Sequence, residues 1–224
     1  MEYTKQTTDR FLNLYRQLET IRDTNSSLYG YYKKKYYEQF DEYRQIRNYL
    51  SHEEYGGGYP VAVSSLVCDD LEEILIRMRK TCLDIATKDV IAYTSLDPLQ
   101  LPIVNFARHG VTYVPIVDER KRVQGIITAG KLLQIMGEQL EKGTKAKMTI
   151  GEYESLFALD NHSKRFVFMG RNEPMAYAER AFSQIEGDKR LGLIIVTEHG
   201  KKEEAMLGVI SIYDVVSEEV KRNK

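Results

Sequence analysis

The sequence predicts an α+β protein in which an N-terminal helical bundle precedes two copies of a βαββα unit. Three observations lead to this prediction. Apolar residues recur at helical spacing through the first 86 residues, short β-branched runs alternate with helical patterns after "ATKDV", and a strand–turn–strand–helix pattern occurs twice. We therefore expect a helical domain at 1–86 and a second domain at 87–224, with its copies at about 87–141 and 146–224.

Three helices are predicted in the first domain. The first spans about 8–23 and carries an apolar stripe formed by Phe11, Leu14, Tyr15, Leu18 and Ile21. A tyrosine-rich turn, "NSSLYGYY", is expected before a second helix at about 33–52. The segment "GGGYP" ends that helix, because glycine and proline both oppose helix continuation. A third helix is expected at about 65–85, leading into the second domain.

The two later copies are alike in residues as well as in pattern. The segment "PIVDERKRVQGIITAGKLL" in the first copy corresponds to "IIVTEHGKKEEAMLGVISIYDVV" in the second. In each, an apolar strand reaches a glutamate (Glu119, Glu198), a polar turn follows, and a second strand ends in a hydroxyl residue before a helix. The connecting segment from Lys142 is expected to hold a short helix of its own. Such recurrence predicts the same local fold twice.

Composition favours a globular protein and argues against several functional classes. Hydrophobic residues make up 42% and charged residues 29% of the chain, and the formal net charge is −1, so no global field attracts nucleic acid or membrane. Cys68 and Cys82 are too few for a disulfide framework and lack metal-ligand spacing. Without a long apolar run or a signal peptide, the protein is expected to be cytoplasmic, with no membrane partner, no metal and reduced cysteines.

The start of the final helix carries the residues best suited to hold a ligand. Ser211 lies where a strand becomes a helix, so its hydroxyl and the free N–H groups of the first turn favour an anion such as phosphate. Asp214 lies in the same turn and can accept hydrogen bonds from ribose hydroxyls, while Gly208 lets a ligand approach the strand. Alternatively, Ser211 and Asp214 form a capping box, in which the acid bonds back to the helix start.

The segment "LGVISIYDV" follows the pattern hGhh[TS]xx[DN]h, in which h is apolar, and "QGIITAGKL" follows it apart from two positions, Gln124 and Lys131. In this, residues 89–220 resemble the tandem cystathionine β-synthase (CBS) domain. The resemblance implies two repeats packed by pseudo-twofold symmetry. It also implies two clefts that hold adenine nucleotides such as AMP, ADP or ATP, or adenosyl compounds, as regulatory ligands.

The first copy departs from this pattern at its final polar position. Gly125 and Thr128 are retained, but Lys131 stands where the second copy has an acid, and lysine cannot accept a ribose hydrogen bond. This cleft is either empty or adapted to a phosphate near Lys131, so we expect one ribose site, in the second copy. Arg108 and His109 could face the first cleft, or lie in an exposed loop.

The second predicted helix ends with Arg47, Asn48 and His52 in "RNYLSH". This arrangement resembles the HEPN (higher eukaryotes and prokaryotes nucleotide-binding) domain, many members of which are metal-independent ribonucleases that join their motifs across a dimer. Histidine can move protons near neutral pH, and arginine stabilises charge on a phosphoryl group. Alternatively, Arg47 and His52 only interact with the negative end of the helix dipole.

Together these features predict a regulatory protein that senses an adenine nucleotide through its CBS-like pair and controls a dimeric HEPN-like domain. No cofactor is expected for chemistry. Two alternatives remain open: a ligand-gated endoribonuclease that uses Arg47 and His52 on RNA, and a non-catalytic dimerisation scaffold.

Overall fold

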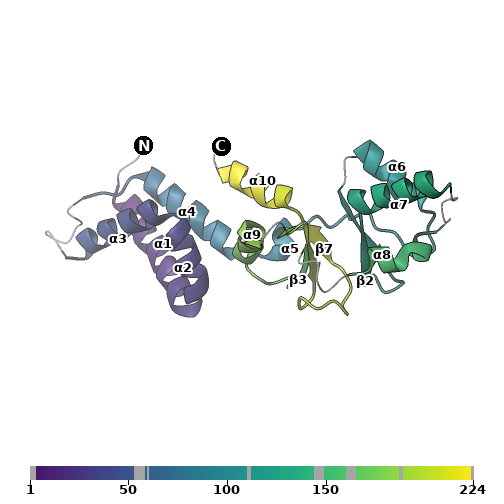
Figure 1. Ribbon diagram of the computed structural model, residues 1–224. Coiled ribbons are helices and arrows are strands. Elements are labelled where there is room, and N and C mark those ends of the chain that lie inside the picture. Colours follow the sequence, from purple (N-terminus) through teal and green to yellow (C-terminus); the bar gives the residue numbers. More distant parts are fainter. Residues whose placement is uncertain are drawn as a thin grey trace. The chain divides into compact units, whose positions relative to one another are not determined.

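A computed structural model describes residues 4–52, 59, 61–109, 112–143, 149–159, 165–186 and 189–222. The chain forms two compact units, one of residues 1–80 with 174–176, and the other of residues 81–173 with 177–224. The described part of the first consists of helices and the short segments that connect them, and the second combines helices with strands (Figure 1). The predicted mixture of helix and sheet with an N-terminal helical region is therefore confirmed.

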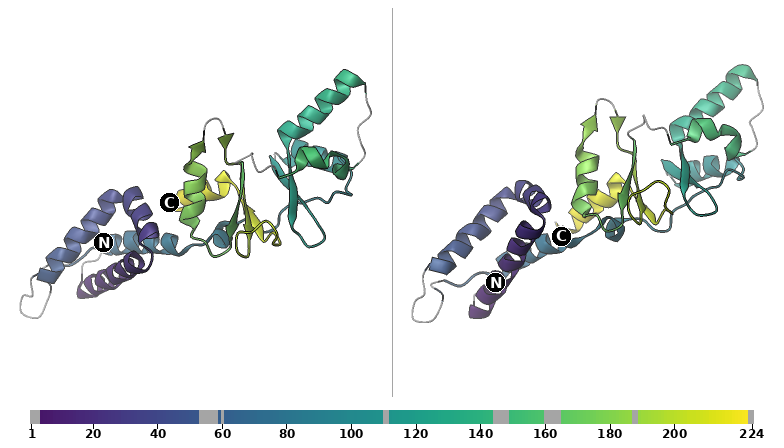
Figure 2. Two further views of the ribbon diagram at one scale, coloured as in Figure 1. Left: turned by 60° about the horizontal axis from the view of Figure 1, so that its bottom comes forward. Right: turned by 90° about the horizontal axis from the view of Figure 1, so that it is seen from below.

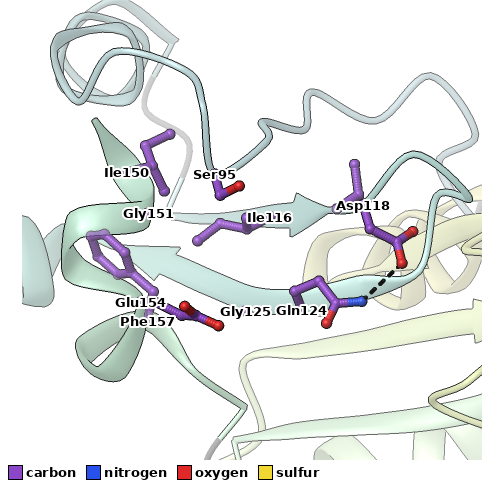
Figure 3. A pocket seen from close by; sticks show the side chains of 10 residues that line it. Ser95, Ile116, Asp118, Gln124, Gly125, Ile150, Gly151, Glu154 and Phe157 are labelled. Atoms are coloured by element: carbon purple, nitrogen blue, oxygen red, sulfur yellow. Dashed lines mark hydrogen bonds between the residues drawn. The ribbon is translucent and has the colours of Figure 1, made fainter. Parts of the chain in front are cut away.

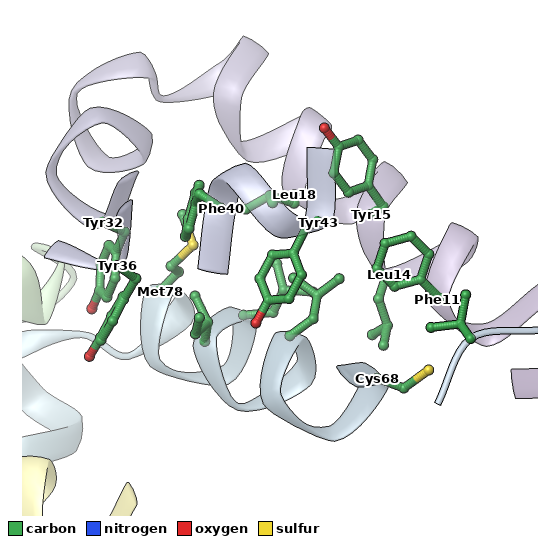
Figure 4. Packing of buried hydrophobic residues seen from close by; sticks show 14 of the residues in the cluster. Phe11, Leu14, Tyr15, Leu18, Tyr32, Tyr36, Phe40, Tyr43, Cys68 and Met78 are labelled. Atoms are coloured by element: carbon green, nitrogen blue, oxygen red, sulfur yellow. The ribbon is translucent and has the colours of Figure 1, made fainter. Parts of the chain in front are cut away.

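The helical unit contains α1 (Lys5–Thr24), α2 (Ser26–Lys35), α3 (Tyr37–His52) and α4 (Ser65–Arg79). A capping box starts α1, because Thr4 and Thr7 exchange side-chain to main-chain hydrogen bonds. The apolar stripes of the four helices meet in one aromatic-rich core (Figure 4). Its fully buried members include Phe11, Tyr32, Tyr43, Leu71 and Ile74.

The prediction of a tyrosine-rich turn after the first helix is wrong, because that segment forms α2. Asn25 starts α2 by accepting a hydrogen bond from the Leu28 N–H at 3.1 Å. Leu28 and Tyr32 are four residues apart and both buried, so packing stabilises a helix that the polar and glycine residues argued against. At the other end, Tyr36 leaves helical geometry (φ −120°, ψ 49°) and separates α2 from α3.

The third predicted helix is shorter than expected, since α4 ends at Arg79. Lys80 has extended backbone angles (φ −65°, ψ 139°), and a separate short helix, α5 (Cys82–Ile85), follows. Thr81 starts α5 by donating its N–H and its hydroxyl to Asp84, each at 2.8 Å. Burial raises the pKa of the Cys82 thiol to about 12, so this cysteine stays protonated at neutral pH.

The first copy in the mixed unit contains α6 (Gln100–His109), β1 (Tyr113–Val117), β2 (Val123–Thr128) and α7 (Ala129–Lys142). Strands β1 and β2 pair antiparallel. In place of a preceding strand, Tyr93 makes a single parallel bridge with Ile116. The first strand of the expected βαββα order is therefore reduced to one residue here.

The second copy contains β3 (Phe166–Gly170), α9 (Met175–Ser183), β6 (Leu193–Thr197), β7 (Gly208–Ile210) and α10 (Ile212–Arg222). Strand β6 pairs parallel with β3 and antiparallel with β7, and α9 and α10 lie on the same side of this sheet (Figure 2). A short hairpin of β4 (Ile185–Glu186) and β5 (Lys189–Arg190), which the sequence pattern did not indicate, is inserted after α9.

The segment before each copy bonds to the other copy. Helix α5 precedes the first copy, and the 3-10 helix η1 (Ile150–Tyr153) with α8 (Glu154–Phe157) precedes the second. In four such main-chain hydrogen bonds, of 2.8–3.1 Å, an N–H of the preceding segment donates to a carbonyl of the other copy. The pairs are Cys82 to Glu173, Leu83 to Arg171, Ile150 to Asp97 and Gly151 to Ser95. The sheets also share a buried core of Val123, Ile126, Leu193 and Ile195. Each copy is thus held to the segment that precedes the other copy: the second copy to α5, and the first copy to η1.

Candidate functional site

The start of α10 brings together the two polar residues predicted for the second copy. Asp214 accepts hydrogen bonds from the N–H and from the hydroxyl of Ser211, each at 2.7 Å. The carboxylate therefore bonds back to the helix start, as the capping alternative requires. The same turn leaves its first N–H groups at the positive end of the α10 dipole, where an anion is favoured.

Thr87 joins this pair from a distant part of the sequence. Its hydroxyl donates to the second carboxylate oxygen of Asp214 at 3.1 Å. The main chain of Thr87 is held in place by two hydrogen bonds with Val209, of 2.9 and 3.0 Å. Sequence reasoning missed Thr87, because only the antiparallel pairing of residues 87 and 209 brings this hydroxyl to Asp214. A half-buried carboxylate with two hydroxyl partners results.

Gly208 lies beneath Thr87 and allows the close pairing just described. A Cβ atom at residue 208 would lie 2.8 Å from the Thr87 carbonyl oxygen and 3.1 Å from the Ala86 Cβ. The missing side chain thus makes room for the main chain that carries Thr87. Packing accounts for this glycine, and its predicted contact with a ligand stays a prediction.

The start of α7 in the first copy differs in its polar groups. The Thr128 hydroxyl accepts a hydrogen bond from the Lys131 N–H at 3.2 Å and so caps the helix. Gly125 again admits main chain, since a Cβ there would lie 2.6 Å from the carbonyl oxygen of Phe157. The residue that approaches Gly125 is apolar, and Lys131 replaces the acid. The first copy therefore lacks the carboxylate–hydroxyl group that the second copy has.

The other predicted side chains near the first copy lie at the end of α6. Arg108 is exposed, as one alternative expected, but it lies on the helix rather than in a loop, and His109 is the last residue of that helix. The side chain of His109 lies outside the described residues.

Arg47 and Asn48 are neighbours near the end of α3. The Arg47 guanidinium donates to the Asn48 side-chain oxygen at 3.4 Å and lies 4.0 Å from a Glu19 carboxylate oxygen. Both distances are long for such contacts, and the Arg47 side chain is 40% exposed. His52 is the last residue of α3, but its side chain lies outside the described residues. The predicted catalytic group is thus described only in part.

Two further properties bear on function. In the described part of the chain, no group of three or more histidine, cysteine, aspartate or glutamate residues is arranged to hold a metal ion. Over the same residues, none of the helices combines the length and the apolar character needed to cross a membrane.

Comparison with known proteins identifies one segment. Residues 82–138, which contain Thr87 and most of the first copy, match the family model of the CBS domain. A curated protein, the L-aspartate semialdehyde sulfurtransferase of Methanocaldococcus jannaschii, is 28% identical over 68 residues. The match covers 30% of this chain and only 13% of the length of that relative.

Several solved structures share a loose likeness with the chain. The match to the AcuB protein of Vibrio cholerae, which is assigned to acetoin utilization, covers 63% of this chain and 91% of the AcuB chain. The sequence identity is 16% and the TM-score is 0.49. The match to CBSX2, solved in complex with AMP, covers 64% of this chain and 98% of the CBSX2 chain, at 14% identity and a TM-score of 0.48. A third match is to the CBS domain pair of protein MJ0100, solved in complex with 5′-methylthioadenosine and S-adenosyl-L-methionine. It covers 65% of this chain and 98% of the MJ0100 chain, at 20% identity and a TM-score of 0.44.

Proposed function

We propose that the start of α10 binds an adenine nucleotide or a related adenosyl compound, and that this binding regulates the N-terminal helical unit. The observation that carries the proposal is the convergence of Thr87, Ser211 and Asp214. The match of residues 82–138 to the CBS domain supports it, because Thr87 belongs to that segment.

Each of the three side chains has a role in this proposal. The Asp214 carboxylate accepts hydrogen bonds from two adjacent ribose hydroxyls, which replace the hydroxyls of Thr87 and Ser211 as donors. The released hydroxyls and the first N–H groups of α10 then donate to the ligand. The first copy, with Lys131 and without such a carboxylate, either holds a phosphate or remains without ligand.

Regulation follows if the ligand binds one arrangement of the protein more tightly than another. Only such a difference in affinity can shift the helical unit between two states. In this proposal the helical unit is a HEPN-like dimerisation domain, and the whole protein is a homodimer that reports nucleotide concentration.

Replacing Asp214 by alanine is expected to weaken nucleotide binding by at least tenfold. Hydrogen bonds to a charged group contribute about 1.5–3 kcal/mol each, which corresponds to roughly 10- to 150-fold in affinity. Isothermal titration calorimetry of the full chain measures this. The titration starts with AMP, ATP, 5′-methylthioadenosine and S-adenosylmethionine.

Two controls make the Asp214 experiment specific. Glu203→Ala removes an exposed acid whose Lys202 partner is 4.0 Å away, and it should leave the dissociation constant unchanged. Thr87→Ser retains the hydroxyl and should bind like the original chain, whereas Thr87→Ala should bind less tightly. Circular dichroism checks that Asp214→Ala retains the helix content of the original chain. Equal affinities for the original chain and Asp214→Ala would contradict the proposal.

A second candidate function is favoured by the weak contacts of Arg47. Its neighbour Arg44, one turn earlier, is ion-paired with Asp41 at 2.6 Å, whereas the Arg47 guanidinium makes the two long contacts given above with the described residues. A guanidinium held this loosely is free to bind phosphate. We therefore propose as the alternative a metal-independent endoribonuclease, in which two protomers combine their Arg47 and His52 residues on RNA.

The matched variants Arg47→Ala and Arg44→Ala test this alternative. We expect Arg47→Ala and His52→Ala each to slow RNA cleavage in EDTA at least 100-fold, because both act on the reacting phosphate. Arg44→Ala should leave cleavage within about twofold. Cleavage by His52→Ala at the original rate would contradict the catalytic role. A dimer without cleavage would instead favour the non-catalytic scaffold.

A further inference from the structure

A second candidate site lies away from the starts of α7 and α10. It is a cavity of about 140 Å³ at the end of β1 and the start of β2, closed by η1 and α8 (Figure 3). Of the residues predicted to bind ligand, only Gly125 lines it, and Thr128 and Lys131 do not. The site is therefore distinct from the nucleotide site proposed above.

A β-bulge shapes the mouth of this cavity. Ile116 pairs with Gly125, but the next residue, Val117, pairs with Val123, so Gln124 has no partner across the β1–β2 ladder. Bulges re-aim side chains and are frequent beside functional sites. Here the freed Gln124 amide donates to the Asp118 carboxylate at 3.2 Å, and both side chains lie at the rim (Figure 3).

Two close main-chain contacts fix the wall that η1 and α8 contribute. The Phe157 carbonyl approaches Gly125, and the Gly151 N–H bonds to the Ser95 carbonyl at 2.8 Å. A Cβ at Gly151 would lie 3.0 Å from that same carbonyl oxygen. The cavity therefore lies between firmly joined walls.

The inner part of the cavity is apolar and small. Ile116, Ile150 and Phe157 line it and are at most 6% exposed. An engineered apolar cavity of about 150 Å³ binds benzene, so this volume suits a body of about six to eight non-hydrogen atoms. A nucleoside has more than twice that number of non-hydrogen atoms, so the inner part of this cavity does not enclose one.

The rim carries a net negative charge. Hydrogen bonds from the main chain of Arg122, together with its side chain and the Arg120 N–H, hold the pKa of Asp118 below its usual value. Asp118 is therefore ionised, and its charge is offset by the Arg122 guanidinium at 2.6 Å. Glu154 also lines the cavity, and within the described ranges its carboxylate has neither a hydrogen bond nor an ion pair. Among the described residues, the Glu154 carboxylate thus has no countercharge.

We propose that this cavity binds a small organic cation, a primary amine with an apolar body of six to eight non-hydrogen atoms. The apolar body contacts Ile116, Ile150 and Phe157, and the ammonium group lies at the rim near Glu154 and the Gln124–Asp118 pair. Such a ligand contacts both the strands of the first copy and the short helix that precedes the second, and so stabilises the contact between them.

Three compounds that share a phenyl ring test the proposal on the full chain labelled with ¹⁵N. Benzylamine is cationic, benzyl alcohol neutral and benzoate anionic. We expect benzylamine to shift the amide resonances of Gly125 and Gly151 with a dissociation constant in the millimolar range, and the other two to bind at least threefold more weakly. Equal binding of all three, or no shift at these glycines, would overturn the proposal.

Matched variants locate the charge. Glu154→Gln should raise the benzylamine dissociation constant about two- to fivefold, as expected for an exposed ion pair. Glu141→Gln, on the exposed face of α7, should leave it unchanged. Asp214→Ala should also leave benzylamine binding intact, so failure of the nucleotide site and failure of this site are told apart. An unchanged dissociation constant for Glu154→Gln would refute the role of the carboxylate.

Discussion

Phe11→Ala is expected to lower the free energy of unfolding of the helical unit by about 3–5 kcal/mol. The Phe11 side chain is 0% exposed, and its ring centroid lies 6.0 Å from that of Tyr15 and 6.4 Å from that of Tyr43. Truncation removes the ring contacts with Tyr15 of α1 and Tyr43 of α3, and leaves a cavity that rigid neighbours fill only in part. Urea unfolding followed by hydrogen–deuterium exchange measures the loss, with peptides from α1 and α4 reporting on this unit.

Tyr37→Ala is the control for this core substitution. The Tyr37 side chain is 65% exposed, so its removal should change stability by no more than about 0.5 kcal/mol. Peptides from the second unit show whether the effect of Phe11→Ala stays local. A cost below about 1 kcal/mol for Phe11→Ala would mean that the aromatic core is not packed as described.

Gly125→Ala is expected to destabilise the second unit by about 1–3 kcal/mol, the usual cost of overpacking. The added Cβ would lie 2.6 Å from the carbonyl oxygen and 3.1 Å from the carbonyl carbon of Phe157. Because both are main-chain atoms, α8 has to move as a whole to relieve the clash. Gly208→Ala should behave alike, since its Cβ would lie 2.8 Å from the Thr87 carbonyl oxygen.

Gly137→Ala separates this clash from the general effect of replacing glycine. Gly137 lies within α7, and an added Cβ would have no other atom within 4 Å. Alanine should therefore stabilise the helix by about 0.5–1 kcal/mol. Urea unfolding monitored by circular dichroism compares the variants. If Gly125→Ala and Gly137→Ala shift the midpoint in the same direction, the close approach at Gly125 is wrong.

Local patterns predicted most of the elements and part of the candidate site. Ser211 and Asp214 were recognisable because their contact spans three residues at a strand-to-helix junction, and the structure shows that contact. The segment 26–35 was misjudged for the opposite reason. Its polar and glycine residues favour a turn, whereas the burial of Leu28 and Tyr32 stabilises a helix.

The amino-acid sequence was enough to locate most of the helices and the main strands, to show that one arrangement occurs twice, and to show which copy carries the acid at its final helix. These properties depend on spacings of two to four residues, which the chain expresses directly. The pairing of distant segments, in contrast, brings Thr87 to Asp214, places the main chain of Thr87 and Phe157 in the space left by the two glycines, and positions α8 over a cavity on β1 and β2. Such contacts depend on which distant segments pair. The free energy of that pairing comes from many buried residues together, so no single position in the sequence reveals it.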